Sequence, residues 1–169
     1  ESFNFLKQNP KYVMVAGKSD TIDNKGKILK RRRFTYDEDL IATRMLIENP
    51  ISHTTVMIRK SIFRKIGKYS LKLKYTQDYD LFSRILNKNL KIKILEKKLT
   101  KVRKHRGQQS FKNQGEQLNE RFYVSLNNLN KKIKINSDIL SLIKFIIFGK
   151  NQKFLRLNIF DKMSVIDEF

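Results

Sequence analysis

The sequence predicts an α/β protein. Three observations indicate this class: short apolar runs that suit buried strands, longer segments with apolar residues at helical spacing, and the mixing of the two over residues 1–110. Apolar residues make up 40% of the 169 residues, which allows a core within one domain or part of one. Beyond that point the pattern is helical or irregular, so we expect a domain over residues 1–110 and a basic helical extension over residues 111–169.

The first segments predict a helix followed by a strand hairpin. Residues 2–8 suit the end of an amphipathic helix, because an Asn-Pro pair follows them. Residues 12–16 form a short apolar run that ends at Gly17, which predicts a buried strand. Residues 20–26 are rich in Asp, Asn and Gly and predict a turn, so a return strand is expected over residues 27–34.

The next segments predict two helices around a strand. Residues 38–48 have helical spacing, with Asp37 as a candidate N-cap and a second Asn-Pro pair at the end. Residues 54–59 alternate like a strand, which places side chains on two opposite faces. Residues 60–66 then predict a short helix that Gly67 ends.

The remaining segments predict one clear helix, two strands and a helical tail. After a loop over residues 68–76, residues 77–87 predict a helix with acidic residues in its first turn. Residues 91–95 and 99–103 are strand candidates. Three helices are expected in the tail, over residues 115–130, 137–148 and 152–160.

The net charge of +21 leaves three classes of partner open. The lysines could be general surface residues, could bind an anionic membrane, or could bind nucleic acid. Most of the positive charges are scattered apart from clusters at residues 31–33 and 101–106, and the first cluster reads as a solvated strand end. Phe82 and Phe122 sit at core-like spacings, which argues against a stacking platform for nucleic acid. The apolar run 139–148 is too short to cross a bilayer and predicts a buried helix or an interfacial one.

The absence of cysteine excludes a disulfide scaffold and a thiolate metal site, and it fits a reducing compartment. No apolar stretch typical of a signal peptide is visible in the first ten residues. We therefore expect a cytoplasmic protein, with peripheral binding to the inner face of the cytoplasmic membrane as a further expectation.

Asp78 and Asp80 stand in the first turn of the predicted helix over residues 77–87. Side chains two residues apart on a helix point in different directions, so these carboxylates do not form a paired acid and base. Backbone N–H groups at a helix N-terminus favour an ionised carboxylate. Such a carboxylate at the mouth of a cleft can act as a general base toward a hydroxyl, and simple helix capping is the alternative role.

Four motifs follow one another along the chain. They are N-P-I-x-H-x-T-V-M-I-R-K from Asn49, G-x-Y from Gly67, Q-D-Y-D-L-x-x-R from Gln77, and R-x-H-x-x-Q-x-S from Arg103. In this order and spacing they resemble the bacterial family 2 glycosyltransferases, which build capsule, lipopolysaccharide and other surface glycans. The resemblance covers residues 3–110 and includes the opening stretch F-L-K-Q-N-P-K-Y-V-M-V-A-G.

The resemblance implies a GT-A fold, an α/β sandwich with a nucleotide-binding N-terminal half and an acceptor-binding C-terminal half. This chain matches the second half. The resemblance also implies a nucleotide-sugar donor, a glycan or lipid-linked acceptor, and Mn²⁺ or Mg²⁺ in the full-length enzyme. The D-x-D-like metal motif and the nucleotide pocket have no counterpart in the sequence, so we expect the 169-residue chain to bind no cofactor and to be inactive alone.

The resemblance places Asp78 at the position of the catalytic base, which removes the proton of the acceptor hydroxyl in an inverting single displacement. Gln77 and Asp80 flank it and are assigned to the acceptor side, with local structure as the alternative for Asp80. His53 is assigned to the acceptor pocket, and its alternative role is a hydrogen bond to the backbone near the strand that it precedes.

Arg103 and His105 share one face if their segment is extended. Their cations could neutralise the leaving diphosphate, and His105 could also approach a metal ion. A solvated basic loop is the alternative. Two other function classes remain open for the whole chain: a binding module for a glycan or a membrane surface without catalysis, and a small nucleic-acid-binding protein.

Overall fold

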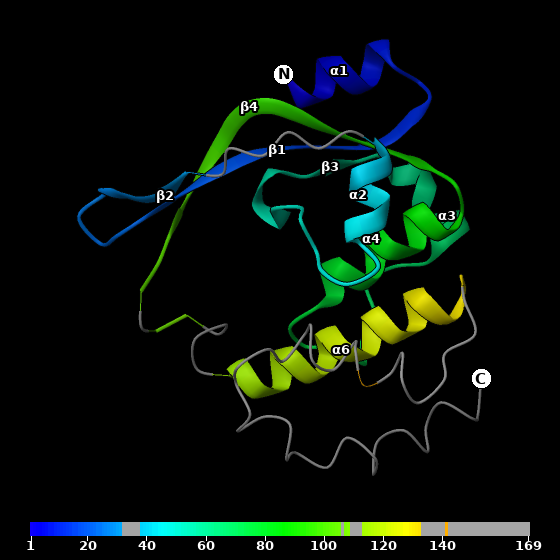
Figure 1. Cartoon of the computed structure of the whole chain (residues 1–169). Helices are drawn as coiled ribbons and strands as arrows, with labels where there is room; N and C mark the ends of the chain where they lie inside the picture. The colour runs from blue at the N-terminus through cyan, green and yellow to red at the C-terminus, as the bar shows by residue number, and fades with distance from the viewer. Residues whose placement is uncertain (32–37, 106, 109–112, 133–140, 142–169) are drawn as a thin grey trace.

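The computed structural model describes residues 1–31, 38–105, 107, 108, 113–132 and 141. These residues form a four-stranded mixed sheet and helices, which confirms the α/β class (Figure 1). The tail helices predicted over residues 137–148 and 152–160, and the apolar run 139–148, lie outside the described residues apart from Ser141. Among the residues described, no helix is both long and apolar enough to cross a membrane.

The sheet is built around strand β1, Tyr12–Ile22. Strand β4, Lys91–Arg103, runs parallel to β1 along one edge. On the other edge, β3 (Met57–Ile58) pairs antiparallel with the start of β1, and β2 (Ile28–Arg31) pairs antiparallel with its end. The central strand is therefore paired on both sides, and most of its residues are buried.

Strand β1 continues past Gly17, where the sequence predicted its end. A Cβ at Gly17 would lie 2.5 Å from the Leu99 side chain of β4, so the glycine allows the two strands to approach closely. Between β3 and β2, the hydroxyl oxygen of Thr55 lies 3.1 Å from the nitrogen and 3.0 Å from the oxygen of Gly17. This side chain takes the place of a strand partner, so the backbone of β1 stays satisfied.

Strand β4 is one strand, whereas the sequence predicted two that were separated at residues 96–98. Two charges in this stretch are paired with β1, Glu96 with Lys18 at 2.5 Å and Lys98 with Asp20 at 2.9 Å, and Lys97 pairs with Glu1 at 2.5 Å. The register of β1 and β4 shifts here, between Ala16 and Ser19, and the two ion pairs join the strands across this irregularity.

The predicted strand over residues 54–59 was also wrong in part. His53–Thr55 form a 3₁₀ turn and only Met57–Ile58 pair with β1, because the Thr55 hydroxyl is held by the Ser52 carbonyl at 2.7 Å as well as by Gly17. The remaining helices agree with the predictions in position, although α2 is shorter than predicted. They are α1 (Ser2–Gln8), α2 (Glu38–Arg44), the 3₁₀ turn Lys60–Ile62, α3 (Phe63–Ile66), α4 (Gln77–Asn87) and α6 (Gln114–Asn130).

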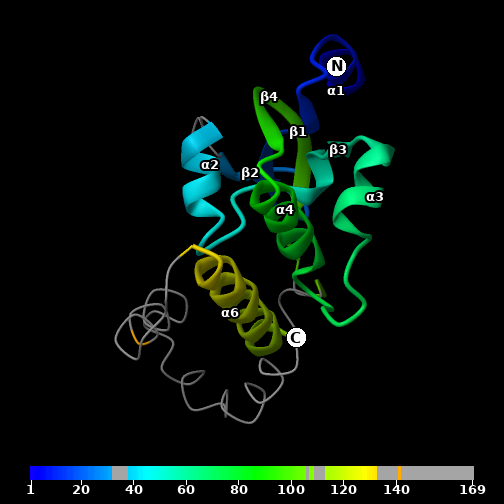
Figure 2. The same cartoon turned by 90° about the vertical axis from the view of Figure 1, so that its right-hand side faces the viewer.

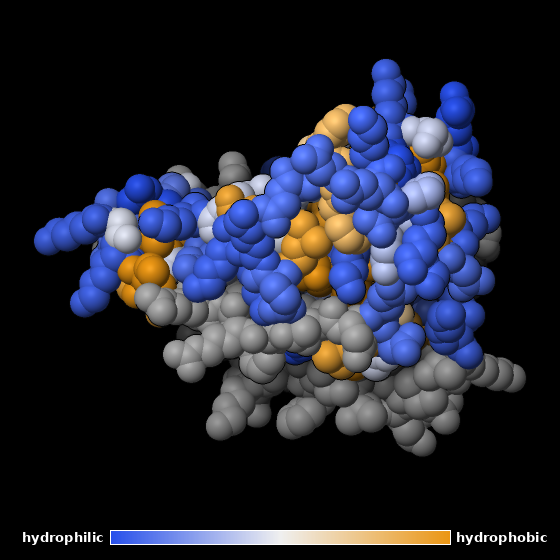
Figure 3. Space-filling view, turned by 90° about the horizontal axis from the view of Figure 1, so that it is seen from above, coloured by the Kyte–Doolittle hydropathy of each residue, from blue (hydrophilic) through white to orange (hydrophobic). Residues whose placement is uncertain are grey.

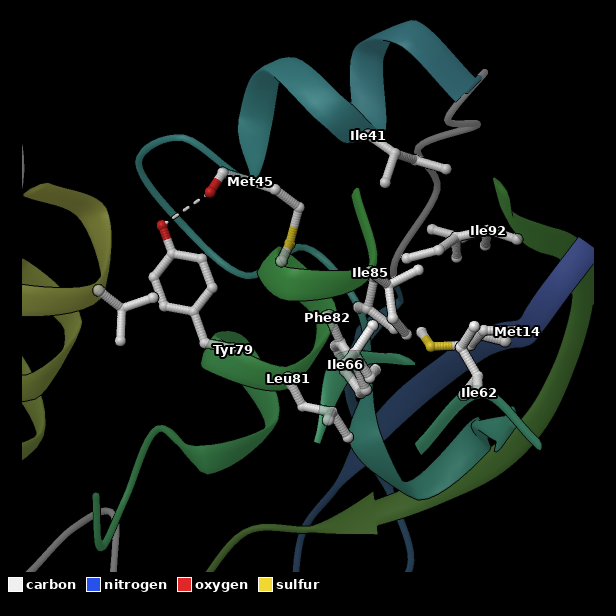
Figure 4. Packing of buried hydrophobic residues seen from close by; sticks show 14 of the residues in the cluster. Met14, Ile41, Met45, Ile62, Ile66, Tyr79, Leu81, Phe82, Ile85 and Ile92 are labelled. Carbon is white, nitrogen blue, oxygen red and sulfur yellow. Dashed lines mark hydrogen bonds between the residues drawn. The ribbon is translucent and has the colours of Figure 1, made fainter. Parts of the chain in front are cut away.

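Helices cover both faces of the sheet (Figure 1). On one face, Leu6 of α1 packs with Tyr12 and Val15 of β1. On the other face lies the main core, in which α2, α3 and α4 pack against the sheet through residues such as Met14 and Phe82 (Figure 4). This core fixes α4, and therefore its first turn, relative to the sheet.

Helix α6 packs against α4 on the side away from α1 (Figure 2). Its buried Asn128 donates to the Met45 carbonyl at 2.8 Å, and its Ser125 hydroxyl donates to the Leu46 carbonyl at 2.8 Å. The Tyr79 hydroxyl of α4 donates to the same Met45 carbonyl at 3.0 Å (Figure 4), and burial raises the pKa of Tyr79 to about 12. The carbonyl groups that follow α2 thus receive their hydrogen bonds from two later helices.

Candidate functional site

The carboxylate of Asp78 is held in a fixed orientation at the first turn of α4. One oxygen accepts the backbone N–H of Tyr79 at 2.8 Å, and the other accepts the side-chain amide of Asn49 at 3.0 Å. Asn49 is itself fixed, because its own oxygen accepts the N–H of Ile51 at 3.0 Å. Each carboxylate oxygen has a second lone pair, so Asp78 can still accept a proton from a substrate.

Burial raises the pKa of Asp78 above its usual value. The Tyr79 N–H, the nearby His53 and the Asn49 amide partly offset this effect, because each favours the ionised form. The net result is a carboxylate that binds a proton more readily than an exposed aspartate does. A general base gains efficiency in this way as its pKa moves toward the working pH.

His53 and Tyr69 lie beside Asp78. The Nε2 atom of His53 is 3.0 Å from the Tyr69 hydroxyl, and the ring centroids are 5.8 Å apart. The ring thus pairs with a side chain, and its assignment to an acceptor pocket stays a prediction. Burial raises the pKa of Tyr69, and the charge of Asp78 raises it further by a smaller amount. The phenol therefore stays protonated and can donate a hydrogen bond. His53 is exposed, which leaves the edge of this cluster open to a ligand.

The polar groups of Asp80 and Gln77 are bound by neighbouring groups of the protein. Asp80 pairs with Arg84 through contacts of 2.7 and 3.0 Å, and Arg84 also donates to the Ile66 carbonyl. The Gln77 amide donates to the Leu73 carbonyl at 2.7 Å. These contacts support local structure as the role of Asp80, and they confirm that the two aspartates of the first turn face different partners.

Glu120 of α6 holds the loop that leads into α4. Its carboxylate accepts the backbone N–H groups of Lys74, Tyr75 and Thr76 at 2.7, 2.7 and 2.9 Å, and the Thr76 hydroxyl at 3.1 Å. A carboxylate bound by several N–H groups makes strong, charge-assisted hydrogen bonds. Helix α6 therefore helps to position the first turn that carries Asp78.

Arg103 and His105 lie away from this cluster. Arg103 is the last residue of β4 and donates to the carbonyl groups of Asp23 and Asn24 at 2.8 and 2.7 Å, so it braces the hairpin between β1 and β2. His105 is exposed beyond the end of β4. In the part of the chain that the structure describes, no contact joins either residue to Asp78, and their role toward a diphosphate remains a prediction from the resemblance.

Comparison with known proteins adds no match: neither a protein-family model nor a curated protein sequence is significantly similar to this chain. The interpretation of the site therefore rests on its geometry and on the motifs. Of the residues assigned from the motifs, His53 lies near Asp78, whereas the Gln77 amide donates to the Leu73 carbonyl. The sequence assigned Asn49 and Tyr69 no role in the site, although both stand in the motifs. It contained no signal for a contribution from Glu120.

Proposed function

We propose that this chain is the acceptor-side half of an inverting glycosyltransferase of family 2 with a GT-A fold, and that Asp78 activates the acceptor hydroxyl. The observation that carries the proposal is the fixed, partly buried carboxylate of Asp78, whose pKa is raised by burial. The order of the four motifs supports the family, and the mixed α/β sheet is compatible with the fold.

The proposed step is a single displacement. Asp78 accepts the proton of an acceptor hydroxyl while the oxygen of that hydroxyl forms a bond to the anomeric carbon of the donor sugar. The bond from this carbon to the diphosphate oxygen breaks, and the nucleoside diphosphate leaves with the electron pair. The base and the acceptor act from one face of the sugar and the leaving group departs from the other, so the configuration is inverted. His53 and Tyr69 supply hydrogen bonds to neighbouring groups of the acceptor.

The donor and its metal ion are assigned to the nucleotide-binding half that the resemblance implies. Among the described residues, no three His, Asp or Glu side chains come together in a way that could hold a metal ion. The step attributed to Asp78 requires only its own carboxylate and the acceptor hydroxyl on this side of the reaction.

A second candidate function is a glycan-binding module without catalysis. A groove of ≈ 380 Å³ lies between α4 and α6. Its lining includes the side chains of Asn87, Tyr123, Asn127 and Asn130. Amide groups donate to and accept from sugar hydroxyls, and an exposed aromatic ring can cover a sugar face. This groove favours binding of a saccharide whether or not Asp78 is a base.

Replacement of Asp78 with asparagine separates these two functions. In the enzyme that includes the donor-binding half, Asp78→Asn should lower the rate of sugar transfer by a factor of about 10²–10⁴, the usual contribution of a general base. Binding of the donor should not change. Asp39→Asn is the matched control, because Asp39 is exposed on α2. Transfer at a near-normal rate by Asp78→Asn would refute the base, whereas saccharide binding without transfer in the unaltered protein would favour the second function.

A further inference from the structure

The hairpin formed by β1 and β2 extends away from the helices (Figure 1), and its sequence holds a dense run of positive charge. Residues 25–31 include four lysine and arginine residues and no acidic residue. Outside this run and a second cluster at residues 101–106, most positive charges are scattered along the chain, so the hairpin carries one of two local concentrations of charge. Clusters of four to eight basic residues are typical of segments that bind anionic headgroups.

An apolar side chain stands within this basic run. Leu29 of β2 is 55% exposed, and the nearby Lys25 and Lys27 are exposed as well. Figure 3 shows apolar side chains among hydrophilic ones at the hairpin end of the molecule. An exposed leucine gains nothing in water, but it gains free energy where it can enter an apolar layer.

The tip of the hairpin is held in a fixed conformation. The Asp23 side chain accepts the N–H groups of Lys25 and Lys27 at 2.9 and 2.8 Å, and Arg103 donates to the carbonyl groups of Asp23 and Asn24. Little conformational entropy is therefore lost when the hairpin meets a surface. This brace is the role that the structure gives to Arg103.

We propose that this hairpin docks the protein on an anionic lipid surface. Lys25 and Lys27 lie at the phosphate groups, and Leu29 enters the boundary between headgroups and acyl chains. A nucleic acid also offers phosphates, but it would give no advantage to an exposed leucine. The projecting part of the hairpin, residues 20–31, also contains no aromatic residue that could stack on bases. A lipid surface therefore fits both the charge and the apolar side chain, and the proposal does not depend on the activity assigned to Asp78.

Vesicle flotation with the full 169-residue chain tests this proposal. The chain should float with vesicles of phosphatidylcholine containing one third phosphatidylglycerol, should bind pure phosphatidylcholine vesicles far more weakly, and should lose binding as salt is added. The double variant Lys25→Gln/Lys27→Gln should lower the partition coefficient roughly thirtyfold, since each basic residue at such a surface contributes about a fivefold factor. The matched control is Lys60→Gln/Lys65→Gln, which removes the same charge from exposed positions outside the hairpin and should change little.

Leu29→Ser should lower partitioning about fivefold, since roughly half of the side chain is available to enter the lipid. Leu71→Ser is its control, because Leu71 is fully exposed in a loop outside the hairpin. Equal binding to both kinds of vesicle would overturn the proposal, as would equal losses in the hairpin variants and their controls. Tighter binding to a 20-nucleotide single strand than to the anionic vesicles, with no effect of Leu29→Ser, would assign the hairpin to nucleic acid and overturn the proposal as well.

Discussion

Replacing Glu120 with glutamine tests whether α6 positions the first turn of α4. One oxygen of Glu120 accepts a single N–H, and the other accepts two N–H groups and the Thr76 hydroxyl. Glutamine keeps one acceptor oxygen and turns an NH₂ group toward a backbone donor, so at least one hydrogen bond is lost. Thr76 is 6% exposed, and a buried N–H without an acceptor costs about 1–3 kcal/mol. We expect Glu120→Gln to lower the free energy of unfolding by about 1–2 kcal/mol, and Glu120→Ala by about 2–4 kcal/mol.

Urea denaturation measures this loss, and hydrogen exchange at the Thr76 amide shows where it arises. Glu116→Gln is the matched control, because it removes the same charge from an exposed position of α6 and should cost about 0.5 kcal/mol or less. The reasoning fails if the two variants have equal stability and the Thr76 amide keeps its protection in Glu120→Gln.

Three further predictions follow from other contacts. Gly17→Ala should lower the free energy of unfolding by about 1–3 kcal/mol, since its Cβ would lie 2.5 Å from the Leu99 side chain and 2.9 Å from a backbone oxygen; an unchanged urea midpoint would contradict the close strand packing. Asn128→Ala should cost about 1–3 kcal/mol by removing a buried donor to the Met45 carbonyl, and a neutral effect in the same assay would show that this bond is dispensable. Burial raises the pKa of Asp78, and only its ionised form accepts a proton. The rate of the proposed sugar transfer should therefore decline as the pH falls through a value above the ordinary pKa of aspartate. A pH profile whose acid limb lies at about 3.9 would refute this.

The helices were the most predictable part of the fold, because their signals are local. The bounds of α4, Gln77–Asn87, are those predicted from its acidic first turn and apolar spacing. The two long strands were only half predicted. The extension of β1 beyond Gly17 depends on the Thr55 hydroxyl, which lies 38 residues away, and β4 continues through a register shift that ion pairs with β1 bridge. Neither contact leaves a local pattern in the sequence.

The candidate site was predictable only where a motif named the residue. Asp78 was singled out by its motif and by its place at a helix start. The sequence predicted only that Asn49 ends a helix. In the structure its side-chain amide donates a hydrogen bond to Asp78, which lies 29 residues later in the chain. Glu120 binds backbone N–H groups, which every residue except proline possesses. The side chains at residues 74–76 therefore could not indicate this contact in the sequence.

The carbonyl groups that follow α2 also have a consequence for the order of folding. The Met45 carbonyl takes its hydrogen bonds from Tyr79 and Asn128, which come 34 and 83 residues later in the chain. During synthesis, this carbonyl therefore gains its first side-chain donor when Tyr79 has been made, and its second only when Asn128 has been made. The side of α4 that α6 covers stays exposed until α6 has been made. A chain released before that point would therefore be prone to aggregation.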